Sequence, residues 1–436
     1  MSFFWEREIE TAERDKLRER QFSRIKELLS LVYEKNPFYR KKYTKAGVSP
    51  ADINSLEDMA KLPFTTKGDF LEDQAKNPPY GTNLTEALSQ YVRYHQTTGT
   101  TGKPLKWLDT KEGWLWRGKC AAMSLTAAGV TAKDTIFFPF AFGPHVAYWG
   151  IFEGAWQLGA LAVAGGGWDT LQRVKFLLEN EVTVVACTPT YALRMAEVAK
   201  ENNLDLRKSK VRLTFHAGEP GALIPAVREK ISSAWGARPF DYPGLTEVGA
   251  YGIHCTAQEA AIHVNEAEFF FELVEPQTGK PVDGSGPGEM VLTNLGRLCS
   301  PAIRFRTGDI VRLAEEKCPC GRNFVLLEGG VIGRVDEMIT IRGMNVFPSQ
   351  VAAVVERYIG VEEAYQIVAY TERGMDNLKV LLEPTPERDP SAIVNMLKLK
   401  LRETLELRVE VEIVAPGTIA RSDYKAKKLV DLRDRR

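Results

Sequence analysis

The sequence predicts an α/β protein with a large N-terminal domain built mainly on parallel sheets and a small C-terminal α+β domain. From Lys111 onward, helical stretches alternate with short apolar runs, as in a parallel sheet whose strands are joined by helices. Beyond Gly333 the order becomes strand, helix, two strands, helix and strand, which is typical of a small split βαβ domain. We therefore predict one domain over residues 1–333 and a second over 334–436.

The N-terminal domain divides into three regions along the chain. Residues 1–40 are predicted as helix, and Asn36-Pro37 ends it. The apolar runs predicted as buried strands are Thr135–Phe140, Ala160–Ala164, Thr183–Ala186 and Val211–Phe215. The helices among them are predicted at Lys111–Ala127, Trp149–Leu158, Thr170–Glu179 and Thr190–Glu201. After Gly252, Glu268–Val274 and Glu289–Asn294 are predicted as antiparallel strands of a small β-barrel-like part.

In the C-terminal domain the strands are predicted at Met338–Arg342, Ala364–Thr371, Leu378–Leu382 and Val409–Val414. The helices are predicted at Ser349–Tyr358 and Ser391–Leu405. The basic segment from Lys425 to Arg436 is predicted as a solvated tail.

Composition narrows the class of protein. The 436 residues carry 57 Lys plus Arg and 57 Asp plus Glu, so the formal net charge is zero, which argues against nucleic acid as the main partner. The apolar run Thr135–Phe152 contains prolines and glycines, which argues against a membrane helix. Charged residues recur from Glu6 to Arg20 without a signal-peptide pattern, and six cysteines do not make a disulfide framework. A cytoplasmic protein with reduced thiols is the simplest expectation.

One loop is rich in groups that bind anions. The string from Thr97 to Pro104 holds four hydroxyls, two glycines and a lysine, and it follows the predicted strand Gln90–His95. Glycines let backbone N–H groups approach a phosphate closely, and the lysine adds a charge. The candidate ligands are Thr97, Thr98, Gly99, Thr100, Thr101, Gly102 and Lys103. A mobile polar turn is the alternative. A Walker A loop is excluded, because Pro104 stands where its hydroxyl residue would follow the lysine.

Three further polar strings punctuate the chain at predicted loops. Gly218-Glu219-Pro220 follows a predicted strand of the parallel sheet, where ligands of such folds bind. The other two strings are Asp241–Glu247 and Arg306–Asp309. Each carboxylate could be a turn residue, but together they offer oxygens to Mg²⁺ and to ribose hydroxyls.

A cysteine pair indicates a metal site. Cys318 and Cys320 flank one proline, and Cys255 and His263 lie upstream. These four residues would make a closed tetrahedral zinc site with a structural role, in which His254 could replace His263. Buried free thiols are the alternative, and a labile disulfide is a third.

The motifs resemble those of adenylate-forming acyl-CoA ligases. In order along the chain, the matching strings are Thr97–Pro104, Gly218–Pro220, Gly244–Glu247, Arg306–Asp309, Gly333–Asp336 and Arg342–Pro348. The last string and the length look like the phenylacetate-CoA ligase branch, some of whose members carry a similar cysteine–histidine set. The resemblance implies ATP-dependent formation of an acyl-adenylate and transfer of the acyl group to coenzyme A.

The resemblance also implies roles for individual residues. Thr97–Lys103 would hold the β- and γ-phosphates, Thr246 would face the α-phosphate and Glu247 would bind Mg²⁺. Gly218, Glu219, Pro220, Asp241 and Tyr242 would line the nucleotide, and Asp309 would take the ribose hydroxyls with help from Arg334. Pro243 stands where many relatives have an aromatic residue on the adenine, so either Pro243 or Tyr242 is expected to pack on the base.

The small domain is expected to bring further residues. Lys425 aligns with the lysine that bridges carboxylate and α-phosphate during adenylation, although Tyr424 replaces a usual glycine and a plain basic tail is the alternative. Asp336 matches the hinge about which this domain rotates, unless it is only a surface turn residue. Gly343 would then lie near bound coenzyme A.

The acid pocket is expected near Phe142 and His145, in the aromatic run from Phe137. Core packing of these aromatics is the alternative. The leading function is therefore AMP-forming ligation of an aryl or apolar acid to coenzyme A. Transfer to an amine or carrier-protein thiol is a second possibility, and a nucleotide-binding scaffold without turnover is a third. A homodimer is expected from the resemblance.

Overall fold

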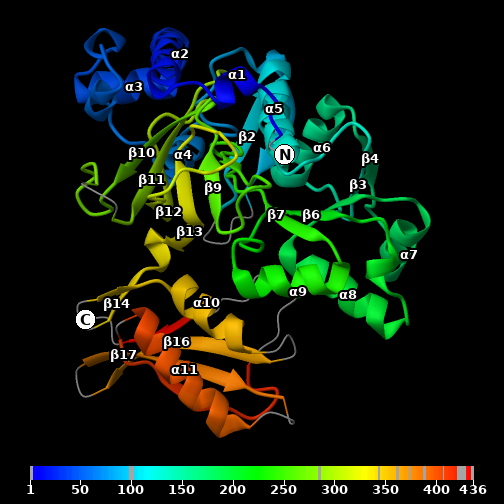
Figure 1. Ribbon diagram of the computed structural model, residues 1–436. Helices are drawn as coiled ribbons and strands as arrows, with labels where there is room; N and C mark the ends of the chain where they lie inside the picture. The colour runs from blue at the N-terminus through cyan, green and yellow to red at the C-terminus, as the bar shows by residue number, and fades with distance from the viewer. Residues whose placement is uncertain are drawn as a thin grey trace. The chain divides into compact units, whose positions relative to one another are not determined.

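The computed structural model describes residues 3–97, 103–282, 286–341, 344–359, 363–372, 375–385, 389–405, 407–419 and 429–433. The chain forms two compact units (Figure 1). The first comprises Met1–Leu223, Arg228–Thr307 and Val311–Gly330, and the second comprises Ile224–Val227, Gly308–Ile310 and Val331–Arg436. No helix among the described residues has the length and apolarity needed to span a membrane.

A five-stranded parallel sheet forms the centre of the first unit, in the order β4-β3-β5-β6-β7. Its strands are β3 (Thr135–Phe138), β4 (Leu161–Ala164), β5 (Val184–Ala186), β6 (Leu213–His216) and β7 (Arg238–Asp241). The helices beside it are α5 (Lys111–Ala127), α6 (Val146–Leu158), α7 (Thr170–Glu179), α8 (Pro189–Glu201) and α9 (Pro225–Trp235). In Figure 1, α5 and α6 lie above this sheet and α8 lies below it. The predicted parallel α/β arrangement is confirmed.

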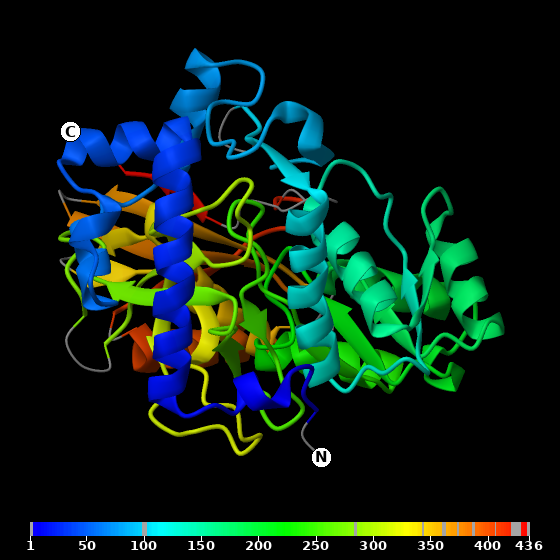
Figure 2. The ribbon, with the colours of Figure 1, turned by 90° about the horizontal axis from the view of Figure 1, so that it is seen from above.

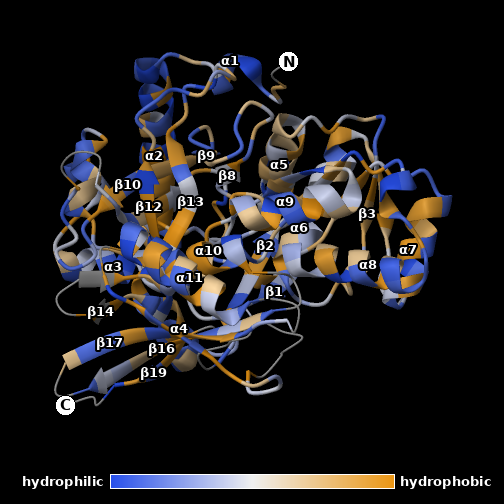
Figure 3. Ribbon diagram, turned by 60° about the horizontal axis from the view of Figure 1, so that its bottom comes forward, coloured by the Kyte–Doolittle hydropathy of each residue, from blue (hydrophilic) through white to orange (hydrophobic). Residues whose placement is uncertain are grey.

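Local sequence explains where these helices begin. Thr110, Asp169 and Thr188 each accept a hydrogen bond from a backbone N–H in the first turn of α5, α7 and α8, respectively. Hydrophilic and hydrophobic residues alternate along α7 and α8, whereas β3 is hydrophobic (Figure 3). This pattern is expected when helices cover a sheet that is buried on both faces.

A six-stranded sheet follows in the order β10-β11-β12-β13-β9-β8. Its strands are β8 (Gly252–Ile253), β9 (Ala261–Val264), β10 (Phe269–Val274), β11 (Gly288–Asn294), β12 (Phe305–Leu313) and β13 (Leu326–Arg334). The pairs β8–β9, β9–β13 and β10–β11 are antiparallel, as predicted for β10 and β11. A separate antiparallel hairpin of β1 (Tyr91–Gln96) and β2 (Lys106–Thr110) carries the loop that begins at Thr97.

The prediction of one helix over residues 1–40 is wrong. The segment forms α1 (Arg7–Glu10), α2 (Arg14–Lys35) and α3 (Pro37–Ala46), and α4 (Lys67–Lys76) comes later. Asn36 does end α2, but its side chain also accepts the N–H of Tyr39 and starts α3 with Pro37 in the first turn. Helix α2, the long dark-blue helix of Figure 2, packs Ile25 and Leu29 in one core with Phe270 of β10. Short 3₁₀ turns lie at Pro50–Asp52, Glu57–Lys61, Leu88–Gln90, Leu206–Lys208 and Val335–Glu337.

The second unit contains a four-stranded mixed sheet in the order β18-β17-β16-β19. Its elements are β14 (Ile339–Ile341), β15 (Met344–Val346), α10 (Pro348–Tyr358), β16 (Ala364–Glu372), β17 (Met375–Glu383), α11 (Pro390–Leu405), β18 (Glu410–Ile413) and β19 (Leu429–Leu432). Two predictions need correction. The first predicted strand joins not this sheet but a two-stranded sheet of β14 and β15. The fourth strand of the sheet, β19, comes from the segment predicted as a solvated tail, and it pairs parallel with β16.

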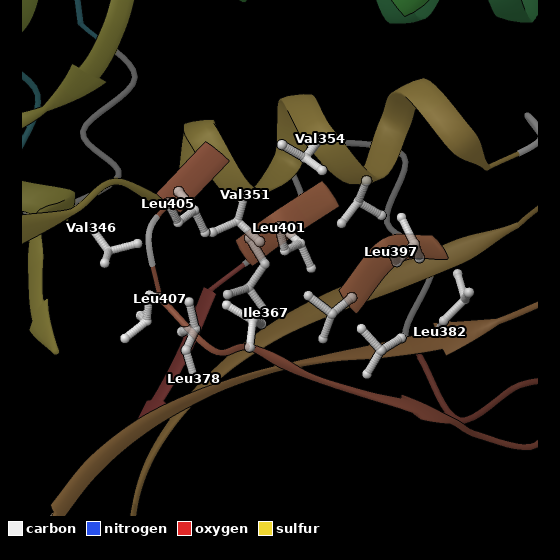
Figure 4. Close-up of a cluster of buried hydrophobic side chains, with 14 of the residues drawn as sticks. Val346, Val351, Val354, Ile367, Leu378, Leu382, Leu397, Leu401, Leu405 and Leu407 are labelled. Carbon is white, nitrogen blue, oxygen red and sulfur yellow. The ribbon is translucent and has the colours of Figure 1, made fainter. Parts of the chain in front are cut away.

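Helices α10 and α11 cover this sheet with an apolar core. Figure 4 shows Val351 and Val354 of α10 and Leu397 of α11 directed toward Ile367 and Leu382 of the strands. These side chains are all nearly inaccessible to solvent. Burying one aliphatic side chain contributes about 1.5–3 kcal/mol, so this cluster gives the small unit a core of its own. The predicted domain limits and the hinge near Asp336 remain predictions.

Candidate active site

The β1–β2 hairpin holds the predicted phosphate loop at its base. The Thr97 N–H donates to the carbonyl oxygen of Leu105 (3.0 Å), and the Leu105 N–H donates to the Thr97 hydroxyl (3.0 Å). Residues Thr98, Gly99, Thr100, Thr101 and Gly102 lie outside the described residues. The side chain of Lys103, where the description resumes, is exposed to solvent. Next to the loop, the Gln96 N–H donates to the Pro144 carbonyl (2.9 Å) and ties the hairpin to the predicted acid-pocket turn.

The carboxyl edge of the parallel sheet presents the loop from Gly218 to Leu223. Gly218 has a φ of +93°, a conformation that favours glycine. Asp241, at the end of β7, is only 5% exposed, and its carboxylate accepts the N–H groups of Gly221 (3.3 Å), Ala222 (2.8 Å) and Leu223 (2.9 Å). Burial raises the pKa of Asp241 to about 6, against the effect of these three donors. This geometry makes Asp241 the residue that fixes the loop.

Glu219 and Tyr242 also have protein partners. The Glu219 carboxylate accepts the backbone N–H of Thr190 (2.9 Å) at the start of α8. The Tyr242 ring packs on Phe215 with centroids 5.4 Å apart, and the side chain is only 5% exposed. Tyr242 therefore lies in the core of the first unit, whereas Pro243 beside it is partly exposed.

Thr246 and Glu247 lie in a tight turn. Leu245 and Gly249 exchange two backbone hydrogen bonds of 3.0 and 2.9 Å across it. A side chain at Gly244 would meet the Ala250 backbone at 2.8 Å, so the close approach requires glycine there. The Glu247 side chain is 6% exposed, and a carboxylate oxygen at that position is a hard donor of the kind that Mg²⁺ prefers.

In the second unit, Arg334 connects two of the predicted residues. Its guanidinium donates to Asp309 at the end of the Arg306–Asp309 string (2.7 Å) and to Asp336 (2.9 Å). Asp309 is 5% exposed, whereas the Asp336 side chain is 62% exposed. Lys425 and Gly343 lie outside the described residues.

Aromatic rings surround the predicted acid-pocket turn. Phe142 has a φ of +51°, which is strained for a bulky residue. Its ring meets those of Trp149 (4.7 Å between centroids), Phe152 (5.5 Å) and Phe140 (5.6 Å). His145 directly precedes α6 and is partly exposed.

The four predicted metal ligands come together in one place. The ligand atoms of Cys255, His263, Cys318 and Cys320 all lie within 4.8 Å of one another, and all four residues are buried. The Nε2 atom of His263 lies 3.4 Å from the Cys320 sulfur and 3.8 Å from the Cys255 sulfur. His254 lies elsewhere, because its Nδ1 accepts the Asp241 N–H (3.1 Å). All six cysteines have free thiols.

Comparison with known proteins identifies relatives along nearly the whole chain. Phenylacetate-coenzyme A ligase of Thermus thermophilus is 31% identical over 98% of this chain and 99% of its own length. The enzyme of the same name from Escherichia coli is also 31% identical, over 98% and 97%. The chain belongs to the phenylacetate-coenzyme A ligase family. Residues 343–433 also match the AMP-binding enzyme C-terminal domain.

A solved structure agrees with this family assignment. A 2-hydroxyisobutyryl-CoA ligase, crystallised in the postadenylation state with an acyl-AMP, is 28% identical with a TM-score of 0.89. The match covers 98% of this chain and 92% of that protein. The predicted family, fold class and enzyme class, an AMP-forming acid–coenzyme A ligase, are therefore confirmed.

Sequence reasoning missed three buried charged residues beside the family motifs. They are Asp109 on β2, Arg117 on α5 and Arg297 after β11, and the two arginines donate to carbonyl oxygens of Thr246 and Glu247. A signal existed for Arg117, because it stands on a helix whose neighbouring residues Trp114, Trp116 and Cys120 are apolar.

Proposed function

We propose that this ligase activates an aryl or other apolar carboxylic acid with ATP and transfers the acyl group to coenzyme A. The identity to phenylacetate-coenzyme A ligases over nearly the whole chain carries the proposal. In the first step an acid oxygen attacks the α-phosphorus and pyrophosphate leaves. In the second, the coenzyme A thiolate attacks the acyl carbon and AMP leaves.

The first step brings two anions together, so donors and cations must offset their repulsion. Thr97 and Lys103, at the ends of the hairpin loop, would hold the β- and γ-phosphates. Thr246 would face the α-phosphate, and the buried Glu247 carboxylate would hold Mg²⁺, which neutralises phosphate charge when bound. The two backbone hydrogen bonds between Leu245 and Gly249, which hold the turn around Thr246, support this role.

The nucleoside would be held by the family's other motifs. The Gly218–Pro220 segment, fixed by Asp241, would line the adenine, and the partly exposed Pro243 is better placed than buried Tyr242 to contact the base. Asp309 would accept the ribose hydroxyls, and its ion pair with Arg334 (2.7 Å) would hold the carboxylate in place for that purpose.

The small domain would serve both steps in turn. Lys425 would bridge the acid and the α-phosphate during adenylation, and rotation about Asp336 would then bring the Gly343 region to coenzyme A. The related 2-hydroxyisobutyryl-CoA ligase supports such a rotation, since it has been crystallised in postadenylation, open and thioesterification states.

We propose that the acid binds beside the rings around Phe142. The ring of Phe142 makes edge contacts with those of Trp149 and Phe140, and such apolar rings would favour an aryl group over a small hydroxylated acid.

Magnesium-dependent ATP–pyrophosphate exchange across a panel of acids tests this function. Phenylacetate and benzoate should support exchange better than 2-hydroxyisobutyrate, and added coenzyme A should release a free thioester. Exchange with an acid but no thioester would favour an amine or carrier-protein acceptor. ATP binding without exchange on any acid would favour the scaffold.

We also propose a structural Zn²⁺ on Cys255, His263, Cys318 and Cys320. Tetrahedral zinc with bonds of about 2.0–2.3 Å spaces its ligands about 3.5–3.8 Å apart, close to the distances between these donor atoms. The thiol of Cys255 and the ring of His263 lower the pKa of Cys320, which favours the thiolate that binds metal, although burial opposes it. His263 Nδ1 lies 3.5 Å from the Phe324 carbonyl, leaving Nε2 for the ion.

Metal analysis of the purified protein tests the site. About one zinc per chain is expected, and His263→Ala should lose it whereas the neighbouring His254→Gln should keep it. Zinc far below one per chain in the wild type would refute the site.

We further propose a cytoplasmic homodimer, on the grounds of the free thiols and the family, and light scattering would test the dimer.

A further inference from the structure

A buried ion cluster lies between two of the family motifs. Asp109, near the end of β2, is completely buried, and Arg297 holds it with two hydrogen bonds, from Nε (2.5 Å) and Nη2 (2.8 Å). The Arg297 guanidinium also lies over the ring of Trp107, 4.8 Å from its centroid. Arg117 approaches the same carboxylate at 3.8 Å. These contacts hold Arg297 against β2, the strand that follows the predicted phosphate loop in the chain.

Both arginines also donate to the Thr246–Glu247 turn. Arg117 donates to the Thr246 carbonyl at 3.0 Å. Arg297 donates through Nη1 to the carbonyls of Thr246 (3.3 Å) and Glu247 (3.1 Å). One guanidinium thus joins the strand beside the phosphate loop to the turn that carries the predicted α-phosphate and magnesium residues.

The charges of the cluster do not cancel. Burial and the Arg297 charge lower the pKa of Arg117 to about 10, so it stays protonated at neutral pH. Burial opposes ionisation of Asp109, but Arg297 and Arg117 outweigh it and hold its pKa below the usual value. His95 nearby is neutral, because burial and Arg117 lower its pKa to about 4. Two buried cations against one anion are expensive to desolvate, and a hydrophobic replacement would cost less.

We propose that Arg297 is a positioning residue for adenylation, which fixes the Thr246–Glu247 turn against the β1–β2 hairpin so that both hold one magnesium–ATP. The inference rests on the proposed function of this site. Arg297 acts through backbone carbonyls and through Asp109, and Arg117 supports the same turn with its single hydrogen bond. A lysine cannot replace the planar fork that contacts Asp109, Trp107 and two carbonyls at once.

Arg297→Lys tests the inference, with Arg304→Lys as the matched control. Arg304 is also buried, pairs with Glu272 (2.7 Å) and donates to the Ala60 carbonyl (3.1 Å), and it contacts none of the proposed site residues that the structure describes. Both variants should lose thermal stability. Only Arg297→Lys should lower kcat of pyrophosphate exchange, by about 10- to 100-fold, and raise the magnesium concentration for half-maximal rate. The KM for the acid should change less than about threefold.

Calorimetric titration with magnesium–ATP in the absence of acid gives a second readout. Arg297→Lys should weaken this binding about tenfold relative to Arg304→Lys. Arg117→Lys should weaken it less, and this variant replaces Arg297→Lys in the test if Arg297→Lys does not fold. Lower stability with wild-type kinetics and binding would overturn the inference. If the wild type binds magnesium–ATP but catalyses exchange with no acid, this result would count against the proposed function. The ratio of the affinities of Arg297→Lys and Arg304→Lys for magnesium–ATP would still decide the role of Arg297. A wild type that binds no ATP would overturn both.

Discussion

Replacing Asp241 by Asn removes one of the two oxygens that accept hydrogen bonds from the Gly218–Leu223 loop. In the wild type one carboxylate oxygen accepts the Ala222 N–H and the other accepts those of Gly221 and Leu223. Asparagine keeps one acceptor and turns its NH₂ group toward one or two of the three N–H donors, according to the orientation of the amide. A buried N–H without a partner costs about 1–3 kcal/mol, so the substitution removes about 1–6 kcal/mol of interaction.

Part of that loss is offset, and the offset depends on pH. Burial raises the pKa of Asp241 from 3.8 to about 6. Between these two pH values, the carboxyl group is therefore protonated in the folded state and ionised in the unfolded state. Its contribution to stability is fully present below about pH 4 and falls by about 3 kcal/mol as the pH rises through 6, because one pKa unit corresponds to about 1.4 kcal/mol. Asn does not titrate, so Asp241→Asn should destabilise the protein more at pH 4.5 than at pH 7.5.

Chemical denaturation at the two pH values measures this difference, and Asp134→Asn provides a control of opposite sign. Burial opposes ionisation of Asp134, but Arg212, Thr183 and Thr131 hold its pKa below the usual value, so its contribution is lost as the pH falls. Asp241→Asn should also raise the KM for ATP about tenfold and leave the KM for the acid unchanged. An effect on stability that does not vary with pH, or an unchanged KM for ATP, would refute the reasoning.

Three other substitutions test other parts of the molecule. Lys425→Ala should lower pyrophosphate exchange at least about 100-fold yet spare thioester formation from supplied acyl-adenylate, and equal loss of both steps would contradict its role. Cys320→Ser should reduce the bound zinc. It should also make the segment around Glu10 sensitive to protease, because Arg322, in the turn after Cys320, donates to the Glu10 carboxylate. Cys187→Ser should have neither effect. Phe142→Leu should raise the KM for an aryl acid about tenfold with the KM for ATP unchanged, and a change in both would mean that the ring only supports the fold.

The sequence predicted best what depends on neighbours along the chain. Helix α7 was predicted at its observed bounds, because Asp169 and Gln172 form a capping box at one end and the apolar spacing is regular. The cluster of Cys255, His263, Cys318 and Cys320 could be predicted from Cys318 and Cys320, because two cysteines so close in sequence point to one turn. The strand β19 was missed because its partner β16 lies far away in sequence, and the charged residues around it resemble a solvated tail.

The residues of the candidate site divide in the same way, into those marked by a local sequence pattern and those that only the fold brings together. Glycine- and threonine-rich strings are recognisable in a sequence because backbone N–H groups bind phosphate in such loops. Close approach of the backbone requires glycine and short polar residues at neighbouring positions. Asp109, Arg117 and Arg297 come from three separate elements and no local pattern links them. Only the fold brings Arg117 and Arg297 to the carbonyl of Thr246, with Asp109 beside Arg297.

Two buried carboxylates fix the site in complementary ways. Asp241 accepts backbone N–H groups and forms no ion pair with any described residue, so burial dominates and its pKa rises to about 6. Asp109 faces two guanidinium groups, so their charge dominates and its pKa falls. The first orders a loop through its donors, and the second orders a turn through arginines that reach its acceptors. Since buried ionic groups seldom increase net stability, both are better explained by the precision they give to the backbone around the proposed nucleotide site. Substitution of either should therefore impair ATP-dependent steps more than its effect on folding alone would predict.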